Sequence, residues 1–146
     1  MKKLMILTTI LMALGISTAC ADNEKPIAVT QLPQKAQLFI KTHFPKEKVA
    51  LAKLERDFLE TRYEVVFTNG SKVEFLKDGE WKEVECKYST VPTAIIPAQI
   101  ASYVSQNYPD TQIVQIDRDK RDYEVKLTNR LELTFDLNFN LIDIDD

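Results

Sequence analysis

The chain has few of the residues on which catalytic and metal sites usually depend. Its 146 residues include one histidine, His43, and two cysteines, Cys20 and Cys86. One histidine excludes a metal centre built from several of them. The sequence also has no G-x-S-x-G motif, no glycine-rich phosphate loop and no C-x-x-C pair. We therefore predict that the protein is not an enzyme and that it uses no cofactor and no metal.

Two acidic segments are the nearest approach to a cation site. Residues 117–122 alternate acidic and basic residues and resemble half of a calcium loop, but the central glycine and the closing glutamate of an EF-hand are missing. Arg118, Lys120 and Arg121 would also oppose a cation. The chain ends in an acidic tip, Asp143, Asp145 and Asp146. We interpret residues 117–122 as a solvated hairpin and expect at most unspecific ion binding at the tip.

The apolar stretch near the N-terminus, residues 4–16, is too short to span a membrane, which takes about 20 residues. It follows Lys2 and Lys3 and precedes Ala19-Cys20-Ala21, which has the small residues of an A-x-A cleavage site. We predict that residues 1–21 are a signal peptide and that the protein is periplasmic or secreted, with no transmembrane segment after cleavage. The alternative is a lipid anchor at Cys20, although Ser17 stands where a lipobox usually has leucine.

Basic residues are outnumbered once the signal peptide is removed. Cleavage removes Lys2 and Lys3, so that the mature chain has 17 of the 19 basic residues and all 22 acidic residues. Nucleic acids and anionic membranes require a basic patch, so neither is expected as a partner. Cys86 is then the one cysteine left, which excludes an intrachain disulfide; we expect it to be a small buried hydrophobe.

What the sequence does contain is an internal repeat. Its matching segments are Pro33–Pro45 and Pro97–Pro109 at an offset of 64 positions, Leu54–Asp57 and Ile116–Asp119 at 62, and Tyr63–Val65 and Tyr123–Val125 at 60. Self-similarity of this kind sets the architecture before any other signal. We predict residues 22–31 as a loosely held lead-in, 32–86 as the first repeat, 87–95 as a linker and 96–146 as the second repeat.

Each repeat is predicted to contain one helix and four strands. A helix starts at Pro33 or Pro97 and stops before Pro45 or Pro109. Short segments that alternate apolar and polar residues follow, and Asn69-Gly70 is expected to form a type I′ hairpin turn. Arg130 stands at the matching place in the second repeat, where it would be strained. Short connections make neighbouring strands antiparallel.

The predicted fold is therefore α+β: two tandem α-β-β-β-β repeats form one antiparallel sheet with the helices packed on one face. The expected contacts between the layers join Phe39, Ile40, Tyr103 and Val104 to Tyr63, Val65, Tyr123 and Val125.

The other face of the sheet is the candidate partner-binding surface. Alternation assigns to it Glu64, Val66, Lys72, Glu74, Glu124, Lys126, Glu132 and Thr134. Charges of both signs are expected to pair laterally there. Trp81 joins this face if its strand is regular, and Trp81→Ala should then abolish partner capture. If a bulge follows Asp78-Gly79, Trp81 instead turns into the core.

Three segments together resemble the PepSY-like family, which is also described as β-lactamase-inhibitor-protein-like in fold. They are the Leu32-Pro33…Phe44-Pro45 helix, the Tyr63-Glu64-Val65 strand and the Glu80-Trp81-Lys82-Glu83-Val84 strand. The resemblance implies an exported protein with tandem repeats, helices on one side and an open, concave sheet face. It supplies no catalytic residues.

Two functions follow from these observations. The first is an exported, non-catalytic binding module that presents its open sheet face to an envelope protein or peptide, including the inhibition of a hydrolase or protease. The alternative is a periplasmic carrier of a small molecule or ion, with its site between the repeats.

Overall fold

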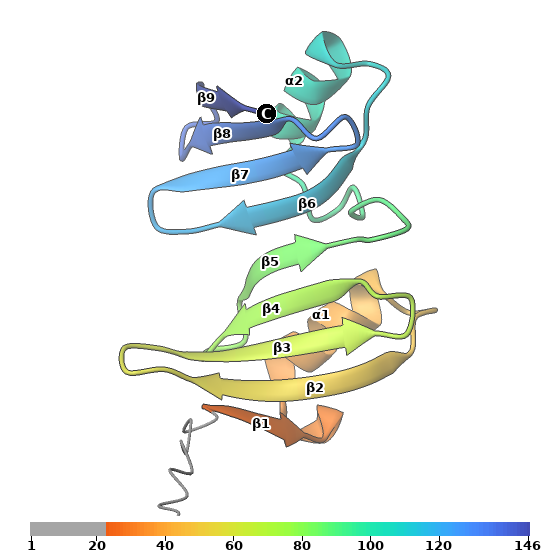
Figure 1. Cartoon of the computed structure of the whole chain (residues 1–146), viewed down its shortest axis with the longest axis vertical. Coiled ribbons are helices and arrows are strands. Elements are labelled where there is room, and N and C mark those ends of the chain that lie inside the picture. The colour runs from red at the N-terminus through yellow and green to blue at the C-terminus, as the bar shows by residue number, and fades with distance from the viewer. Residues whose placement is uncertain (1–22) are drawn as a thin grey trace, which may run out of the picture.

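The computed structural model describes residues 23–146, so the predicted signal peptide and Cys20 lie outside the described residues. Two α-helices and nine strands make up this part of the chain (Figure 1). The helices are α1, Gln34–His43, and α2, Ala98–Asn107, and a short 3-10 helix, η1, spans Val29–Gln31. The strands are β1 Glu24–Ile27, β2 Val49–Arg56, β3 Thr61–Phe67, β4 Lys72–Leu76, β5 Trp81–Glu85, β6 Ile113–Arg118, β7 Asp122–Leu127, β8 Glu132–Asp136 and β9 Leu141–Asp145.

All nine strands form one antiparallel sheet in the order of the sequence, from β1 to β9. The first unit contributes β2 to β5 and the second β6 to β9. The pairing of β5 with β6, in which Val84 lies opposite Ile116, joins them. The predicted fold class is confirmed, with one more strand than the two repeats supply.

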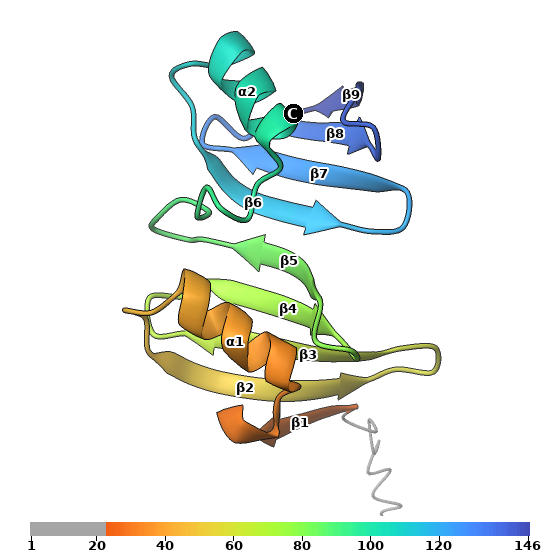
Figure 2. The ribbon, with the colours of Figure 1, turned by 180° about the vertical axis from the view of Figure 1, so that it is seen from behind.

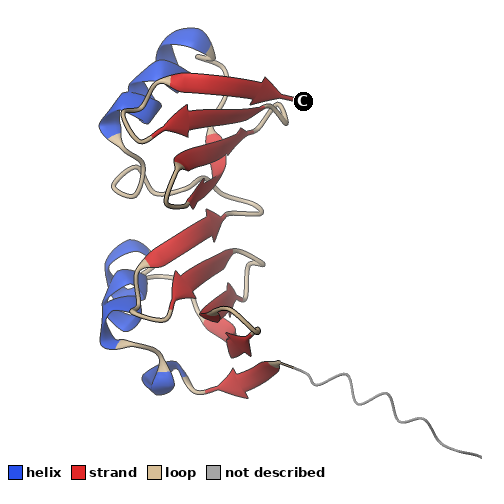
Figure 3. Cartoon of the chain, turned by 90° about the vertical axis from the view of Figure 1, so that its left-hand side faces the viewer, coloured by secondary structure: helices blue, strands red, loops and turns tan. Residues whose placement is uncertain are grey.

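Both helices lie on the same face of the sheet (Figures 2 and 3). Each begins directly after a proline, Pro33 or Pro97, and each is followed by an aromatic C-cap residue, Phe44 or Tyr108, that precedes the next proline. A proline at the start of a helix costs nothing, because the N–H groups of the first turn have no intrahelical acceptor.

The core between the layers repeats as well. Phe39 of α1 packs edge-on against Phe75 of β4, with ring centroids 5.5 Å apart, and Tyr103 of α2 packs in the same way against Phe135 of β8, also at 5.5 Å. Phe75 and Phe135 are fully buried. Edge-to-face contacts of this kind stabilise a fold beyond the area that they bury.

The Asn69-Gly70 turn differs from the sequence prediction, whereas Arg130 has the expected positive φ, +74°. Gly70 alone of the Asn69-Gly70 pair has a positive φ, +85°, and a type I′ turn needs two such residues. The Phe67 N–H donates to the Ser71 carbonyl and the Gly70 N–H to the Phe67 carbonyl, which closes a three-residue loop of type I turn plus bulge. The Asn69 side chain accepts from the Ser71 N–H at 2.9 Å and fixes this turn.

The segment before the first helix is ordered in the structure, unlike the loosely held lead-in expected for residues 22–31. Residues 24–27 pair with β2, and Glu24 lies opposite Glu55. The salt bridge between Lys53 and Glu24, 3.1 Å long, also ties β1 to its neighbour. The first unit thus gains an edge strand that the second unit lacks.

Candidate functional site

The helix-free face of the sheet is covered with charged side chains. On the helix side, every strand from β3 to β8 has at least one fully buried residue. One such residue from each strand lies in a single row across the sheet: Val65, Val73, Val84, Ile116, Val125 and Leu133. Their neighbours along each strand point to the opposite face, because successive side chains alternate.

One row of residues on this open face is almost entirely acidic. The strand register places its members directly opposite one another from β3 to β9: Glu64, Glu74, Glu83, Asp117, Glu124, Thr134 and Asp143. We call this set the carboxylate row. From Glu64 to Glu124 every neighbouring pair in it carries two like charges. Such pairs destabilise a sheet.

Three cations contact the carboxylate row, each at one point. Lys53 lies 3.2 Å from Glu64, Arg62 lies 2.9 Å from Glu74, and Lys82 lies 3.2 Å from Asp117. Lys53 also contacts Glu24 and Glu55. Burial lowers the pKa of Lys53, but the hydrogen bonds and charges of Glu24 and Glu64 outweigh this effect and raise it. The cations therefore sit towards one half of the row.

Glu83 and Glu124, near the middle of the row, form no salt bridge among the described residues, and the pKa values of both are raised. Burial, followed by the charges of Asp117 and Glu74, raises the pKa of Glu83. Its side chain accepts one hydrogen bond from Gln115, 2.7 Å long. Burial also raises the pKa of Glu74, because the opposing effect of Arg62 is smaller.

The neighbouring row behaves as the sequence predicts, with charges of both signs. Its members from β3 to β9 are Val66, Lys72, Glu85, Gln115, Lys126, Glu132 and Asp145. Lys72 pairs with Glu85 at 3.3 Å and Lys126 with Glu132 at 3.5 Å. Opposite charges therefore pair within this row, whereas neighbouring members of the carboxylate row carry like charges from Glu64 to Glu124.

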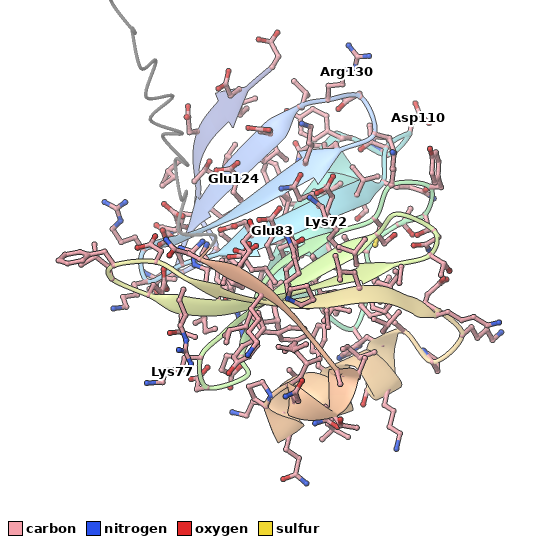
Figure 4. The ribbon with its side chains drawn as sticks, turned by 60° about the horizontal axis from the view of Figure 1, so that its bottom comes forward. Lys72, Lys77, Glu83, Asp110, Glu124 and Arg130 are labelled. Carbon is pink, nitrogen blue, oxygen red and sulfur yellow. The ribbon has the colours of Figure 1, made fainter. Side chains whose placement is uncertain are left out.

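Eight of the nine predicted surface residues lie on the open face. Glu64, Glu74, Glu124 and Thr134 belong to the carboxylate row, and Val66, Lys72, Lys126 and Glu132 belong to the row beside it. Figure 4 shows Lys72, Glu83 and Glu124 together on the side of the sheet away from α1.

Three members of the carboxylate row were not among the predicted surface residues: Glu83, Asp117 and Asp143. Alternation from the apolar residues Val84 and Ile116 gives the side on which Glu83 and Asp117 lie. It does not give the register that brings them together.

Trp81 is placed apart from these eight residues. A bulge at Lys82 lets Glu74 face Glu83 while Phe75 faces Trp81, so the indole turns to the helix side. There its ring lies 6.4 Å from that of Phe39, and the Arg118 guanidinium lies 4.0 Å above it. Of the two placements that the sequence left open, the structure has the bulge.

A groove lies between the two units, at the end of the sheet that carries the β2–β3, β4–β5 and β6–β7 turns. This open groove has a volume of about 940 Å³. Its lining residues are Glu60, Arg62, Leu76, Glu80, Trp81, Lys82, Arg118, Asp119, Lys120, Arg121 and Tyr123. Arg118 donates to Glu80 at 2.9 Å and to the Trp81 carbonyl at 2.8 Å, which fixes the floor of the groove.

Within residues 23–146 no group of three His, Cys, Asp or Glu side chains is arranged to hold a metal ion. Neither helix of that part of the chain is long and apolar enough to cross a membrane.

The family model described as "Putative beta-lactamase-inhibitor-like, PepSY-like" matches residues 18–60 and 61–143, which confirms the resemblance seen in the sequence. No curated protein matches the chain in sequence.

Three solved structures of Bacteroides proteins are similar to it over nearly their whole length. One, from Bacteroides thetaiotaomicron, is described as a "putative calcium-regulated periplasmic protein"; it is 66% identical, covers 86% of this chain and 99% of its own, and has a TM-score of 0.85. A Bacteroides vulgatus protein, described as periplasmic and of the DUF2874 family, is 60% identical with the same coverage and a TM-score of 0.84. A second B. vulgatus protein, described as periplasmic and of unknown function, is 36% identical over 84% of this chain and 99% of its own, with a TM-score of 0.81.

Proposed function

Because this chain belongs to the PepSY-like family of β-lactamase-inhibitor-like proteins, we propose that it is a non-catalytic periplasmic binding module whose open sheet face binds a basic segment of an envelope protein or peptide. The periplasmic location is that of its relatives. The observation that carries the proposal is the carboxylate row.

The row is costly for the free protein. Carboxylates that face each other across neighbouring strands repel, and those that are half-buried also lose hydration. Lysine or arginine side chains of a partner would relieve both costs at once. Binding energy is therefore available at this face for a partner of opposite charge.

The dimensions of the row define the partner further. From Glu64 on β3 to Asp143 on β9 there are six steps between strands, roughly 29 Å at about 4.8 Å a step. An extended peptide of about nine residues covers that length at about 3.3 Å a residue. The partner segment is thus a basic strand or loop of that size, as a hydrolase or protease held by this face would present.

The proposal is tested with a fluorescent nine-residue peptide that alternates lysine and threonine. We expect the purified protein to bind it with an affinity that falls as salt is added, and an equivalent glutamate–threonine peptide to remain unbound. Replacing two central carboxylates of the row that form no salt bridge among the described residues, Glu83→Gln with Glu124→Gln, should weaken binding at least tenfold.

The matched control removes the same charge from the neighbouring row, Glu85→Gln with Glu132→Gln. These carboxylates already pair with Lys72 and Lys126, so we expect little change in affinity. Equal losses of affinity in both double variants would mean that net charge alone attracts the peptide.

A pull-down from envelope extract with the same proteins as bait then identifies the natural partner.

The groove between the units supports the alternative, a carrier. Its lining includes the aromatic rings of Trp81 and Tyr123 and the cations Lys120 and Arg121. A small anionic molecule with an apolar part suits such a surface. Thermal-shift screening of aromatic carboxylates tests this function: a shift that Arg121→Gln removes and Glu83→Gln leaves intact would favour the carrier.

The alternative function also includes an ion carrier, and calcium is the ion to consider because the B. thetaiotaomicron relative is described as calcium-regulated. Calcium takes six to eight oxygen ligands, and the described residues do not fit it as they stand, because no three carboxylates converge and Lys82 contacts Asp117. Titration with calcium, with magnesium as control, tests whether Glu83 and Asp117 amide signals shift in an NMR spectrum.

We further propose that residues 1–21 are removed as a signal peptide and that residues 32–86 and 96–146 are the two repeats. Mass spectrometry of the exported protein decides between its two N-termini. A chain that starts at Asp22 supports cleavage after Ala21. A chain that starts at a diacylated Cys20 would instead show that the protein is lipid-anchored.

A further inference from the structure

The two edges of the sheet are built differently. The outer strand of the first unit, β1, contains Pro26, which has no N–H to offer a further strand, and the charged residues Glu24 and Lys25 precede it. The outer strand of the second unit, β9, has no proline and exposes two isoleucines, Ile142 and Ile144. Proteins commonly protect edges with proline and charge, and only β1 carries a proline.

The internal repeat shows what is missing at β9. Val84 of β5 and Ile144 of β9 are equivalent, since each lies opposite a buried residue of the preceding strand, Val73 or Leu133. Val84 is fully buried, whereas 49% of Ile144 is exposed. The first unit has β6 paired beside it, with Ile116 opposite Val84. Within residues 23–146 no strand pairs with the outer edge of β9.

We propose that the outer edge of β9 binds one extended strand of a partner protein, which continues the sheet as β6 continues it beyond β5. The pairing of β5 with β6 gives the register: Ile144 would face an apolar residue, and Asp143 and Asp145 would face its two neighbours on the open face. Because both are acidic, the strand that fits is basic–apolar–basic. Main-chain hydrogen bonds supply affinity and the alternate side chains supply specificity.

A second copy of the chain fits this edge less well. Two β9 strands paired antiparallel about Ile144 would place Asp143 against Asp145 twice, on the face that already carries excess negative charge. Pairing of β9 with β1 of another copy would meet Pro26, which cannot donate. A partner strand with basic residues has neither difficulty.

This edge site goes beyond the proposed function, since it uses main-chain groups of β9 and a helix-side isoleucine. Variants at Ile144 and at Glu83 separate the two sites. If only the double variant Glu83→Gln with Glu124→Gln loses peptide binding, the peptide binds the open face. If only Ile144→Thr loses it, the peptide binds the edge of β9.

The test uses a labelled ten-residue peptide of alternating lysine and valine and two backbone-methylated versions of it. One version is N-methylated at the valines and the other at the lysines. Alternate N–H groups of a strand point to opposite edges. Strand addition therefore predicts that one version loses binding at least tenfold while the other binds like the parent. Charge attraction alone predicts equal binding of both and would overturn the proposal.

Substitutions in the protein complete the test. Ile144→Thr keeps a β-branched residue at an exposed position, so the fold should persist, and peptide affinity should fall about tenfold. The matched control is Leu51→Thr on β2, which is 40% exposed but distant from β9 in the strand order, and its affinity should be unchanged. Amides of β9 should become protected from hydrogen exchange when the peptide binds.

Two results would contradict the inference. Unchanged affinity in Ile144→Thr would remove the edge as the site. A free protein that sediments as a dimer, and that Ile144→Thr converts to a monomer, would mean that a second copy occupies the edge.

Discussion

Glu83 of β5 lies directly opposite Asp117 of β6, so the joint between the two units sets one carboxylate against another. Lys82 contacts Asp117 at 3.2 Å, and Glu83 receives a hydrogen bond from Gln115. The fold closes this joint through buried Val84 and Ile116 on the other side of the sheet. Apolar packing on one side thus holds together a surface that its charges push apart.

Removal of one of these charges should stabilise the protein. We expect Glu83→Gln to raise the free energy of unfolding by about 0.5 kcal/mol, because glutamine keeps the shape and ends the repulsion from Asp117 and Glu74. Urea unfolding followed by circular dichroism measures the change. The matched substitution Glu85→Gln breaks the contact with Lys72 and should give no gain. A loss of stability in Glu83→Gln would show that Gln115 compensates the charge fully.

The same carboxylates set the expected dependence of stability on pH. The pKa values of Glu74, Glu83 and Glu124 are raised above the ordinary 4.5, so the folded state binds their protons more readily than the unfolded state. At neutral pH the charged forms of these three carboxylates therefore reduce the stability of the fold. This loss of stability shrinks as the pH falls through the raised pKa values and is gone well below pH 4.5.

The midpoint of thermal unfolding should therefore be higher at about pH 5 than at about pH 7. Burial lowers the pKa of His43, so protonation of this one residue below 6.5 acts in the opposite direction. At lower pH the lowered pKa values of Glu80 and Asp119 reverse the trend, because their stabilising charges are then lost. Between pH 7 and pH 5 the midpoint of thermal unfolding should rise less for Glu83→Gln than for the unchanged protein. An equal rise in both would assign the effect to other groups.

Trp81 is a packing residue in this structure, and its truncation should reduce stability. Its ring contacts Phe39 from one unit and Arg118 from the other. We expect Trp81→Ala to lower the free energy of unfolding by about 2 kcal/mol, less than for a fully buried ring because the indole is partly exposed. Trp81→Phe should lose less than half of that. If Trp81→Ala kept full stability, the indole would contribute little to the joint between the units.

The fold follows from short-range signals, and the candidate site does not. The proline pairs Pro33–Pro45 and Pro97–Pro109 bracket both helices, and alternation around Val65 and Val125 gives the faces of the strands. The row depends instead on register. One bulge at Lys82 turns Trp81 to the helix side and leaves Glu83 opposite Glu74, and the pairing of β5 with β6 places Glu83 opposite Asp117. β1 gave no periodic signal, because it has four residues and one is proline.

Arg130 offers the sharpest test of the repeat itself. It occupies the place of Gly70 in the equivalent turn: its N–H donates to the Leu127 carbonyl as that of Gly70 does to Phe67, and its φ is +74° against +85°. Residues with a side chain are strained at positive φ, by about 1 kcal/mol or more. We expect Arg130→Gly to raise the free energy of unfolding by about 1 kcal/mol and Gly70→Ala to lower it by a similar amount, both measured by urea unfolding. A Cβ on Gly70 would lie 3.2 Å from the flexible Lys87 side chain, which can move, so backbone strain accounts for the loss. If Arg130→Gly destabilised the protein, contacts of the arginine side chain would outweigh the backbone strain. The two turns would then share their backbone geometry but not their energetics.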